Sequence, residues 1–424
     1  MERYSDYKDS GIPWIVEVPK HWEEKRAKYL FNKENRIPEE TDEVITCFRD
    51  GTVTLRKNRR ITGFTESFKE IGYQGIKKGD LVIHQMDAFA GSTGVSDCNG
   101  KATPVYSVCT PKDNTLLTQY YAKVIRLMGL NGFIQSLYRG IRERSSDFRF
   151  ETFARQLLPV PPLQEQEKIV SYLDGKTSKI DAYVADKERE IELLQELKQT
   201  AIADAVTKGL NPNGKMKDSG ISWIGMIPEH YEIKQLRSFL SLFSEKGHGD
   251  AQLLSVTREQ GVILRDKDNK EENHNFVPED LSGYKYIEKG DFVINKMKAW
   301  QGSYAVSNYN GIVSPAYYTC KLKGVNNDFF SMAIRSKAYV GFFTSYSKGI
   351  RVGQWDLDPN ALKSIPFFLP PIEEQLSIVS HIERKCAKIS SLITELESEI
   401  NYLKEYKQRL IADCVTGQVN VQNV

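Results

Sequence analysis

A long internal repeat constrains this chain more than any other feature of its sequence. The peptide KDSGIPWIVEVPKHW begins at Lys8, and the related peptide KDSGISWIGMIPEHY begins at Lys217, 209 residues further on. Solenoid repeats are much shorter, about 20 to 50 residues. The spacing therefore predicts that the 424 residues form two copies of one module.

Further matched segments extend the repeat along the chain. They are IKKGDLVIHQM from Ile76 with IEKGDFVINKM from Ile287, RGIR from Arg139 with KGIR from Lys348, PPLQEQEKIV from Pro161 with PPIEEQLSIV from Pro370, and AIADAVT from Ala201 with LIADCVT from Leu410. The offset changes to 211 and then returns to 209. Small insertions of this kind are typical of loops on a shared scaffold.

Each module is expected to have a globular part and a long helix. The globular part mixes short β-like runs, such as DLVIHQM and AYYTCKL, with turn signals and helix-like stretches, so we expect an α/β or α+β domain. The predicted boundaries are 1–160 for the first globular domain, 161–208 for the first helix, 209–369 for the second domain, 370–417 for the second helix and 418–424 for a C-terminal tail.

The helical segments carry a heptad pattern, in which apolar residues recur at alternating spacings of four and three. The predicted pairing residues are Leu173, Ile180, Val184, Ile191 and Leu194 in the first segment, and Ile382, Ile389, Ile393, Ile400 and Leu403 in the second. This pattern favours a coiled coil between the two helices. The alternative is that each helix lies alone on its own domain. Lys198 and Lys407 occupy equivalent positions in the two seams.

Connectivity predicts the direction of this pairing. If the ends of the second domain lie close together, as domain termini often do, the two helices must run antiparallel. The molecule is then pseudo-twofold, and the repeated KDSG peptide follows a helix end in both halves as a docking strap. We expect Trp14 and Trp223 to anchor it. Helices of about 40 residues would be roughly 60 Å long.

Composition excludes several classes of protein. A formal net charge of +2 gives no global signal for nucleic acid, so DNA binding would need locally concentrated positive charge. The six cysteines form no CxxC pair, and no apolar run reaches the about 18 residues of a membrane span. We therefore expect a cytoplasmic protein with no metal, no cofactor and no membrane partner.

The motifs together resemble the DNA-specificity subunit of Type I restriction–modification enzymes. The matching residues are the two KDSG peptides, KKGD and EKGD, KGIR, and LPPIEEQ leading into a long helix. The resemblance implies a non-catalytic subunit in which each globular domain recognises one half of a split, asymmetric DNA site. It also implies that the helices set the spacing and bind two methyltransferase subunits, and that two restriction subunits with translocase and nuclease activity can join.

Candidate DNA-binding residues lie in three places in each module. The basic stretch of the first domain holds Arg56, Lys57, Asn58, Arg59 and Arg60, and the second domain has Arg265 and Lys267 in a more acidic stretch. The Gly-Ile-Arg loops contribute Arg142, Arg144 and Ser145, and Arg351, Gln354 and Trp355. The turn after a predicted strand holds Gln85 in one copy, and Lys296 and Lys298 in the other.

These residue types suit DNA recognition, because Arg and Lys neutralise phosphates or pair with guanine, and Asn pairs with adenine. For the basic stretch, the alternative is an ordinary solvated loop. For the Gly-Ile-Arg loops, it is that these residues build the loop while the residues after them read bases. Because the turns differ in charge between copies, we expect two different half-sites.

Two other classes of function are less well supported by the sequence. A self-contained methyltransferase or nuclease would need motifs that the sequence lacks: GKT at Gly175 has no P-loop before it, and SPAY at Ser314 follows no glycine-rich cofactor loop. The alternative is a non-catalytic two-headed adaptor that binds protein or glycan ligands, and the basic loops favour DNA over it.

Overall fold

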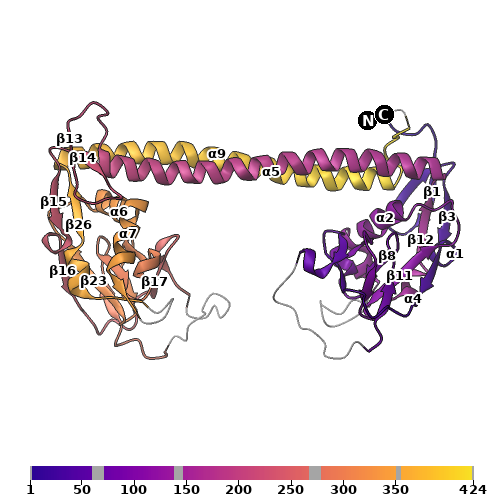
Figure 1. The fold of residues 1–424 in the computed structure, drawn as a ribbon, viewed down its shortest axis with the longest axis horizontal. Helices are drawn as coiled ribbons and strands as arrows, with labels where there is room; N and C mark the ends of the chain where they lie inside the picture. Colours follow the sequence, from indigo (N-terminus) through magenta and orange to yellow (C-terminus); the bar gives the residue numbers. More distant parts are fainter. Residues whose placement is uncertain (1, 60–70, 138–146, 267–277, 350–354, 423–424) are drawn as a thin grey trace. The chain divides into compact units, whose positions relative to one another are not determined.

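The computed structural model describes residues 2–59, 71–137, 147–266, 278–349 and 355–422 (Figure 1). Contacts divide the chain into two compact units: unit 1 comprises Met1–Lys187 and Ser398–Val424, and unit 2 comprises Glu188–Glu397. Both boundaries fall inside the long helices α5 (Leu163–Lys208) and α9 (Ile372–Val415). Each unit therefore contains one globular domain and part of each long helix.

The globular domain of unit 1 is rich in short strands. In chain order its elements are β1 (Tyr7–Ile12), β2 (Ile15–Pro19), β3 (Glu23–Arg26), α1 (Ala27–Leu30), β4 (Phe31–Glu34), β5 (Ile45–Cys47), β6 (Val53–Leu55), η1 (Arg56–Asn58), β7 (Gln74–Ile76), β8 (Leu81–His84), η2 (Ala88–Ala90), β9 (Thr93–Val95), β10 (Gly100–Ala102), β11 (Tyr106–Pro111), α2 (Thr118–Leu130), α3 (Phe133–Ser136), α4 (Phe150–Phe153) and β12 (Leu157–Val160).

Unit 2 repeats this order with small changes. Its elements are β13 (Met216–Asp218), β14 (Met226–Pro228), β15 (Glu232–Gln235), η3 (Leu236–Ser238), β16 (Leu240–Phe243), β17 (Leu254–Thr257), β18 (Gly261–Leu264), β19 (Lys285–Ile287), β20 (Phe292–Asn295), η4 (Ala299–Gln301), β21 (Tyr304–Val306), β22 (Gly311–Val313), β23 (Tyr317–Leu322), α6 (Asn327–Arg335), α7 (Lys337–Tyr346), β24 (Ser347–Lys348), β25 (Asp356–Leu357), α8 (Pro359–Ser364) and β26 (Pro366–Leu369).

A four-stranded antiparallel sheet forms the centre of each domain. Its strand order is β4-β11-β8-β9 in unit 1 and β16-β23-β20-β21 in unit 2. The central strand β8 is apolar on both sides, because Leu81 and Ile83 belong to one hydrophobic core and Val82 belongs to another. Successive side chains of a strand point to opposite faces, so a continuous apolar run predicts a sheet that is covered on both faces.

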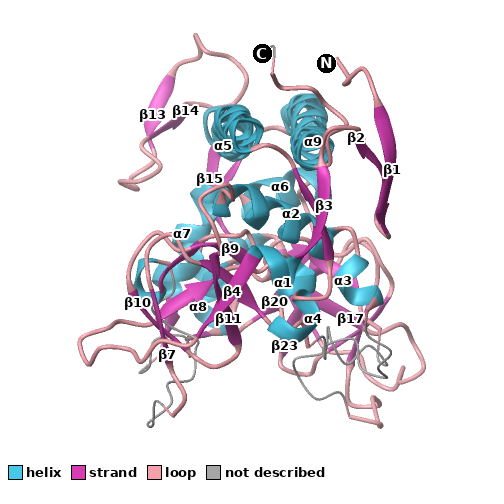
Figure 2. Ribbon diagram, turned by 90° about the vertical axis from the view of Figure 1, so that its right-hand side faces the viewer, coloured by secondary structure: helices cyan, strands magenta, loops and turns pink. Residues whose placement is uncertain are grey.

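The long helices α5 and α9 pack together and run antiparallel (Figures 1 and 2). In unit 1, Lys407 on α9 forms an ion pair with Asp181 on α5, at 2.6 Å. In unit 2, the Lys198 ammonium donates to the Ser390 hydroxyl at 2.9 Å. The ten predicted pairing residues are all buried or partly buried. The expected α+β fold with two packed helices is therefore confirmed.

The helix ends also belong to the cores of the globular domains. The main core of unit 1 includes Leu173 of α5 and Leu410 of α9, and the main core of unit 2 includes Val206 and Ile382. Residues such as Leu173 and Ile382 therefore pack on a domain as well as along the helix pair. The two interpretations of the apolar stripe thus both hold, in different parts of each helix.

The repeated KDSG peptide is the first strand of a hairpin. Lys8 reaches the carbonyl of Trp22, and Lys217 reaches that of Tyr231. The Asp9 carboxylate accepts from the Gly11 amide at 2.8 Å, and Asp218 accepts from Gly220 at 3.0 Å. The peptide recurs because its polar side chains form the same turn in both units.

The anchors of this strap differ from those predicted. Trp22 is 1% exposed and Tyr231, its counterpart, is fully buried. Trp14 is only partly buried beside Phe133, and Trp223 is 53% exposed. Trp22 and Tyr231 are thus the main apolar anchors, because they follow the hairpin and enter the core directly.

Candidate nucleic-acid interface

The turn after the central strand has the same backbone frame in both units. In unit 1 the Asp87 amide donates to the His84 carbonyl at 3.2 Å, and in unit 2 the Lys298 amide donates to the Asn295 carbonyl at 3.0 Å. The short helices η2 and η4 follow, and each ends in a glycine with positive φ. The strand and its hydrogen bonds therefore hold these two turns in matching conformations.

The side chains that this frame presents are different. Gln85 donates to the Pro104 carbonyl and the Ser107 hydroxyl, both at 3.3 Å, whereas its counterpart Lys296 pairs with Asp356 at 3.1 Å. Asp87 pairs with Arg49 at 3.1 Å, whereas Lys298 is exposed. One turn is acidic and the other is basic.

Each turn also exposes an apolar side chain between these polar positions. Met86 and Met297 are both 51% exposed. A flexible thioether at a surface turn suits contact with an apolar group of a ligand. Neither methionine was among the predicted site residues, although the aligned QMD and KMK segments contain them.

The basic stretch of the first domain is held in place by acidic neighbours. Lys57 pairs with Glu43 and Arg59 pairs with Asp50, both at 2.6 Å. Asn58 donates to the Thr54 hydroxyl at 2.9 Å. These ion pairs are exposed, and exposed pairs contribute only about 0 to 1 kcal/mol. Phosphates can therefore replace the carboxylates at little cost.

The second domain places its candidates differently. Arg265 is partly buried and its amide donates to the Leu253 carbonyl at 2.9 Å. Trp355 packs against Trp300 with ring centroids 5.1 Å apart, next to the Lys296 turn. Arg60, Arg142, Arg144, Ser145, Lys267, Arg351 and Gln354 lie outside the described residues.

Two arginines that the sequence analysis did not select support the loops. Arg126 donates to the Arg49 carbonyl at 3.2 Å, and Arg335 donates to the carbonyls of Arg258 and Glu259 at 2.9 and 2.8 Å. Burial lowers the pKa of both guanidinium groups. Their separation of 209 residues is the one sequence signal that could have revealed them.

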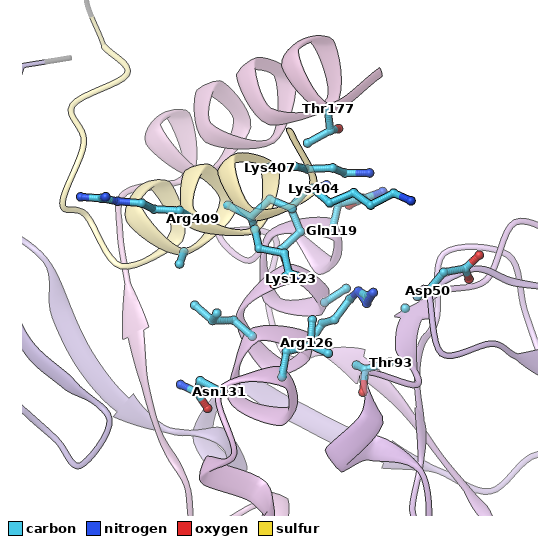
Figure 3. A pocket seen from close by; sticks show the side chains of 18 of the residues that line it. Asp50, Thr93, Gln119, Lys123, Arg126, Asn131, Thr177, Lys404, Lys407 and Arg409 are labelled. Atoms are coloured by element: carbon cyan, nitrogen blue, oxygen red, sulfur yellow. The ribbon is translucent and has the colours of Figure 1, made fainter. Parts of the chain in front are cut away.

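Within each unit, a groove lies beside the contact between the domain and the long helices. In unit 1 it has a volume of about 900 Å³ and lies between α2, with Gln119, Lys123 and Arg126, and α9, with Lys404 and Lys407 (Figure 3). In unit 2 a groove of about 1020 Å³ includes Arg335 and Lys198. Lys123 pairs with Asp174 at 2.7 Å, so part of the positive charge in unit 1 is neutralised within the chain.

The described residues offer no sign of a metal centre or a membrane span. Among them, no group of three or more His, Cys, Asp or Glu side chains is placed to hold a metal ion. No helix in the described ranges combines the length and apolar character needed to cross a membrane.

Two β-rich domains of one design, joined by two packed helices, are the architecture of known specificity subunits. The HsdS subunit from Thermoanaerobacter tengcongensis superposes with a TM-score of 0.52 and 13% identity, covering 95% of this chain and 98% of that one. A chain from a structural study of complex assembly and conformational transition of the type I R-M system superposes with a TM-score of 0.67 and 14% identity, covering 95% and 99%.

Sequence comparison points to the same group. The EcoKI specificity subunit of Escherichia coli K12 is 24% identical over 287 residues, and the StySPI specificity subunit of Salmonella potsdam is 23% identical over 283 residues. Each match covers 62% of this chain and 58% of the relative. No family model matches the sequence. By fold and by distant sequence similarity, the chain resembles the specificity (HsdS) subunits of type I restriction–modification systems, and the predicted resemblance is confirmed.

Proposed function

We propose that this chain is the non-catalytic DNA-specificity subunit of a type I restriction–modification complex. Each globular domain would read one half of a bipartite, asymmetric site in double-stranded DNA. The long helices would set the spacing and dock two methyltransferase subunits, and two restriction subunits would join the complete complex. The names and folds of its relatives support this proposal.

One observation carries the proposal for two different half-sites. The turns after β8 and β20 share their backbone hydrogen bonds but present Gln85 and Asp87 in one unit and Lys296 and Lys298 in the other. Base edges are distinguished by their pattern of donors and acceptors. Two domains that read different bases in the same manner need the same backbone conformation with different side chains, and these two turns have both.

Electrostatics favour binding through local patches. The net charge of +2 cannot attract a polyanion by itself. The exposed pairs at Lys57 and Arg59 supply cations in fixed positions, and phosphate contacts of this kind give orientation and salt-dependent affinity. We therefore propose that the basic stretch contacts the backbone and that the strand-end turns contact base edges.

Methylation mapping tests the proposal. The chain is co-expressed with its methyltransferase subunit in a host that lacks other methylation, and modified bases are mapped across the genome. We expect a split motif with two unlike halves and a fixed unread gap. A palindromic motif, or methylation that does not require this chain, would contradict the proposal. Retention of the purified complex on DNA should also fall as the salt concentration rises. Retention that is independent of salt would exclude the phosphate contacts.

A further inference from the structure

Two exposed methionines occupy the same place in the two units. Met86 and Met297 are the middle residues of the turns that follow β8 and β20, and each is 51% exposed. Their separation of 211 residues is the offset of the repeat in this region of the sequence. The residues on either side of them differ between the units, so the methionine is the exposed side chain that the two turns share.

The other large apolar residues that the globular domains expose show no repeated position. They are Val16, Tyr29, Ile37, Ile71 and Leu130 in unit 1, and Leu210, Trp223, Met226, Ile233, Leu264 and Tyr309 in unit 2. Within the described ranges, none of them aligns with an exposed large apolar residue of the other unit. Scattered apolar residues of this kind are normal on a protein surface. An exposed pair at one structural position, in contrast, indicates a shared role.

Each methionine stands on a turn that the domain holds in place. Ala88 and Ala299, two residues after the methionines, are fully buried. In unit 1 a Cβ atom on Gly129 of α2 would lie 2.1 Å from the Ala88 carbonyl oxygen, so the helix backbone rests directly on the turn. In unit 2 the Thr344 hydroxyl of α7 donates to the Trp300 carbonyl at 3.1 Å. The backbone below the methionine is therefore fixed, whereas the long, unbranched side chain can adapt to what it contacts.

An exposed arginine lies beside each turn, at the tip of a hairpin. Arg49, between β5 and β6, pairs with Asp87 at 3.1 Å. Arg258 lies between β17 and β18, and its Cγ atom is 3.8 Å from the place that a Cβ atom would take on Gly302, the residue that ends η4. The two arginine side chains are 68% and 72% exposed. A cation therefore accompanies the methionine in both units.

Two partly buried arginines hold these hairpin tips. Arg126 donates to the Arg49 carbonyl at 3.2 Å, and Arg335 donates to the Arg258 carbonyl at 2.9 Å. Both the exposed and the partly buried arginine of unit 1 lie 209 residues from their counterparts in unit 2. The same contact thus places the same exposed guanidinium group in each domain. Such a group suits a phosphate of the DNA backbone, because charge-assisted hydrogen bonds to phosphate are strong.

The chemistry of base edges limits what the methionines can contact. In the grooves of double-stranded DNA, the four base pairs are distinguished mainly by hydrogen-bond donors and acceptors. The C5-methyl group of thymine, which lies in the major groove, is the apolar member of this pattern. An apolar side chain that stands between polar side chains on one turn is therefore complementary to a thymine methyl group with donors and acceptors on either side of it.

We propose that Met86 and Met297 each contact the methyl group of a thymine, one in each half-site of the DNA. Arg49 and Arg258 bind a backbone phosphate beside that thymine and so fix the position of the duplex on the turn. The inference rests on the proposed function and adds a particular base to it. The two half-sites then differ at the bases that the neighbouring side chains read, but they share a thymine at the same place relative to those bases.

Binding to modified duplexes tests the thymine contacts. The full chain, assembled with its methyltransferase subunit, is titrated with a duplex that carries the motif found by methylation mapping. Each thymine is replaced in turn by deoxyuridine, which lacks only the C5-methyl group. We expect one replacement in each half-site to weaken binding about fourfold, the contribution of one buried methyl group. M86A should abolish this effect in the first half-site only, and M297A in the second only, so each variant is the matched control for the other.

Further variants separate the methionine from the arginines. M86L keeps an apolar side chain on the turn and should retain the sensitivity to deoxyuridine. R49A should lower the slope of log affinity against log salt by about 0.9, the value for one phosphate contact, whereas M86A should leave the slope unchanged. R126M should lower the slope as R49A does, and R49A/R126M should lower it no further, because Arg126 acts by placing Arg49. Circular dichroism of each variant checks that the fold is retained.

The outcomes distinguish this inference from the proposed function. A complex that binds no duplex selectively would contradict both. A complex that recognises its motif, but whose half-sites lack thymine or tolerate every deoxyuridine, would overturn only the methionine contacts. If 2-aminopurine in the duplex instead becomes more fluorescent on binding, and M86A removes that rise, the methionine is a wedge between base pairs and does not read thymine. An unchanged salt slope in both R49A and R258A would refute the phosphate contacts.

Discussion

At the scale of single residues, a carboxylate holds each strap to its long helix, and this carboxylate is buried in unit 1 and partly exposed in unit 2. Glu165, in the first turn of α5, accepts from Tyr4, from His21 at 2.9 Å and from Trp22 at 3.1 Å. Burial and the contact with Glu165 raise the pKa of Tyr4 well above its usual range, so its hydroxyl remains a donor. In unit 2, Glu374 accepts from His230 at 2.6 Å and from Tyr231 at 3.2 Å.

Replacing these carboxylates should destabilise the two units unequally. The Glu165 side chain is 2% exposed and that of Glu374 is 25% exposed. Leaving buried donors without an acceptor costs about 1 to 3 kcal/mol. We expect E165A to lower the stability of unit 1 by about 3 kcal/mol and E374A to lower that of unit 2 by about half as much. Hydrogen exchange resolved by unit measures both losses, and equal losses would contradict the role of burial.

The turn after β8 should respond to acid. Burial lowers the pKa of His84, whose neutral ring accepts from the Asp87 amide at 3.1 Å. A lowered pKa means that His84 binds a proton less readily in the folded turn than in the unfolded chain. The stability that this hydrogen bond contributes to the turn is therefore fully present above the ordinary histidine pKa of 6.5. It is lost as the pH falls through the lower pKa that His84 has in the folded protein.

Amide exchange at Asp87, corrected for its intrinsic pH dependence, tests this expectation. Protection should fall progressively as the pH decreases below 6.5, the ordinary histidine pKa. The control is H84N, which installs the residue that unit 2 has at this position. The variant should lose the pH dependence, and an identical profile in H84N would show that another group is responsible.

Exchanging charge in the turns should alter one half-site at a time. We expect D87K to change only the bases read by the first domain, and K298D to change only those read by the second. A contact with a base edge typically accounts for about 1 to 3 kcal/mol of discrimination. Methylation mapping of both variants provides the measurement. A uniform loss of methylation at an unchanged motif would assign these residues to phosphate instead.

Sequence reasoning located motifs better than it assigned their roles. The repeat gave the KKGD and EKGD segments, but it could not show that Asp80 and Asp291 accept from the amides of Lys77 and Glu288 at 2.7 and 2.8 Å. The pairing of Lys57 with Glu43 and of Arg59 with Asp50 could not be predicted either, because pairing across a loop depends on the tertiary fold. The sequence alone therefore did not show that the cations of Lys57 and Arg59 are paired with carboxylates in the folded protein.

At the scale of elements, the long helices were the most predictable part of the chain. Segments 161–208 and 370–417 were expected, and α5 and α9 extend over Leu163–Lys208 and Ile372–Val415. A heptad pattern is strong over such lengths, whereas strands of three or four residues carry little periodic signal. Most of the short strands, such as β5 and β6, were therefore not predicted individually.

Lengthening both helices should lengthen the unread gap of the DNA site. Two heptads inserted after Lys187 in α5 and after Glu397 in α9 preserve the seam and add about 21 Å to each helix. We expect the gap between half-sites to grow, by as much as about 6 base pairs. The control inserts two heptads into α5 alone, which should disrupt pairing. An unchanged gap in the double insertion would refute the role of the helices as a spacer.

At the scale of the whole molecule, the two ends of the chain meet within unit 1. The Asn420 amide donates to the Glu2 carbonyl at 2.9 Å, and Gln418 donates to the Glu17 carbonyl at 2.9 Å. Val419 and Val421 are buried in the main core of this unit. The residues predicted as a tail, 418–424, thus include part of a core.

Removing these residues should weaken unit 1 selectively. Deletion from Gln418 onward exposes the apolar surface that Val419 and Val421 cover, and we expect a loss of about 3 kcal/mol. Hydrogen exchange should rise in the first domain and remain unchanged in unit 2. The milder variant V419A should produce a smaller effect in the same direction. Unaltered exchange in unit 1 would mean that the segment only rests on its surface.

The division of the long helices also determines the order in which the protein can be completed during synthesis. Unit 2 is one uninterrupted stretch of chain, Glu188–Glu397, so all of its residues have been made before Ser398–Val424 is translated. Unit 1 also needs Ser398–Val424, which is translated after the whole of unit 2. Domains generally fold as they emerge, N-terminal first. Of these two units, the one that begins first is therefore completed second.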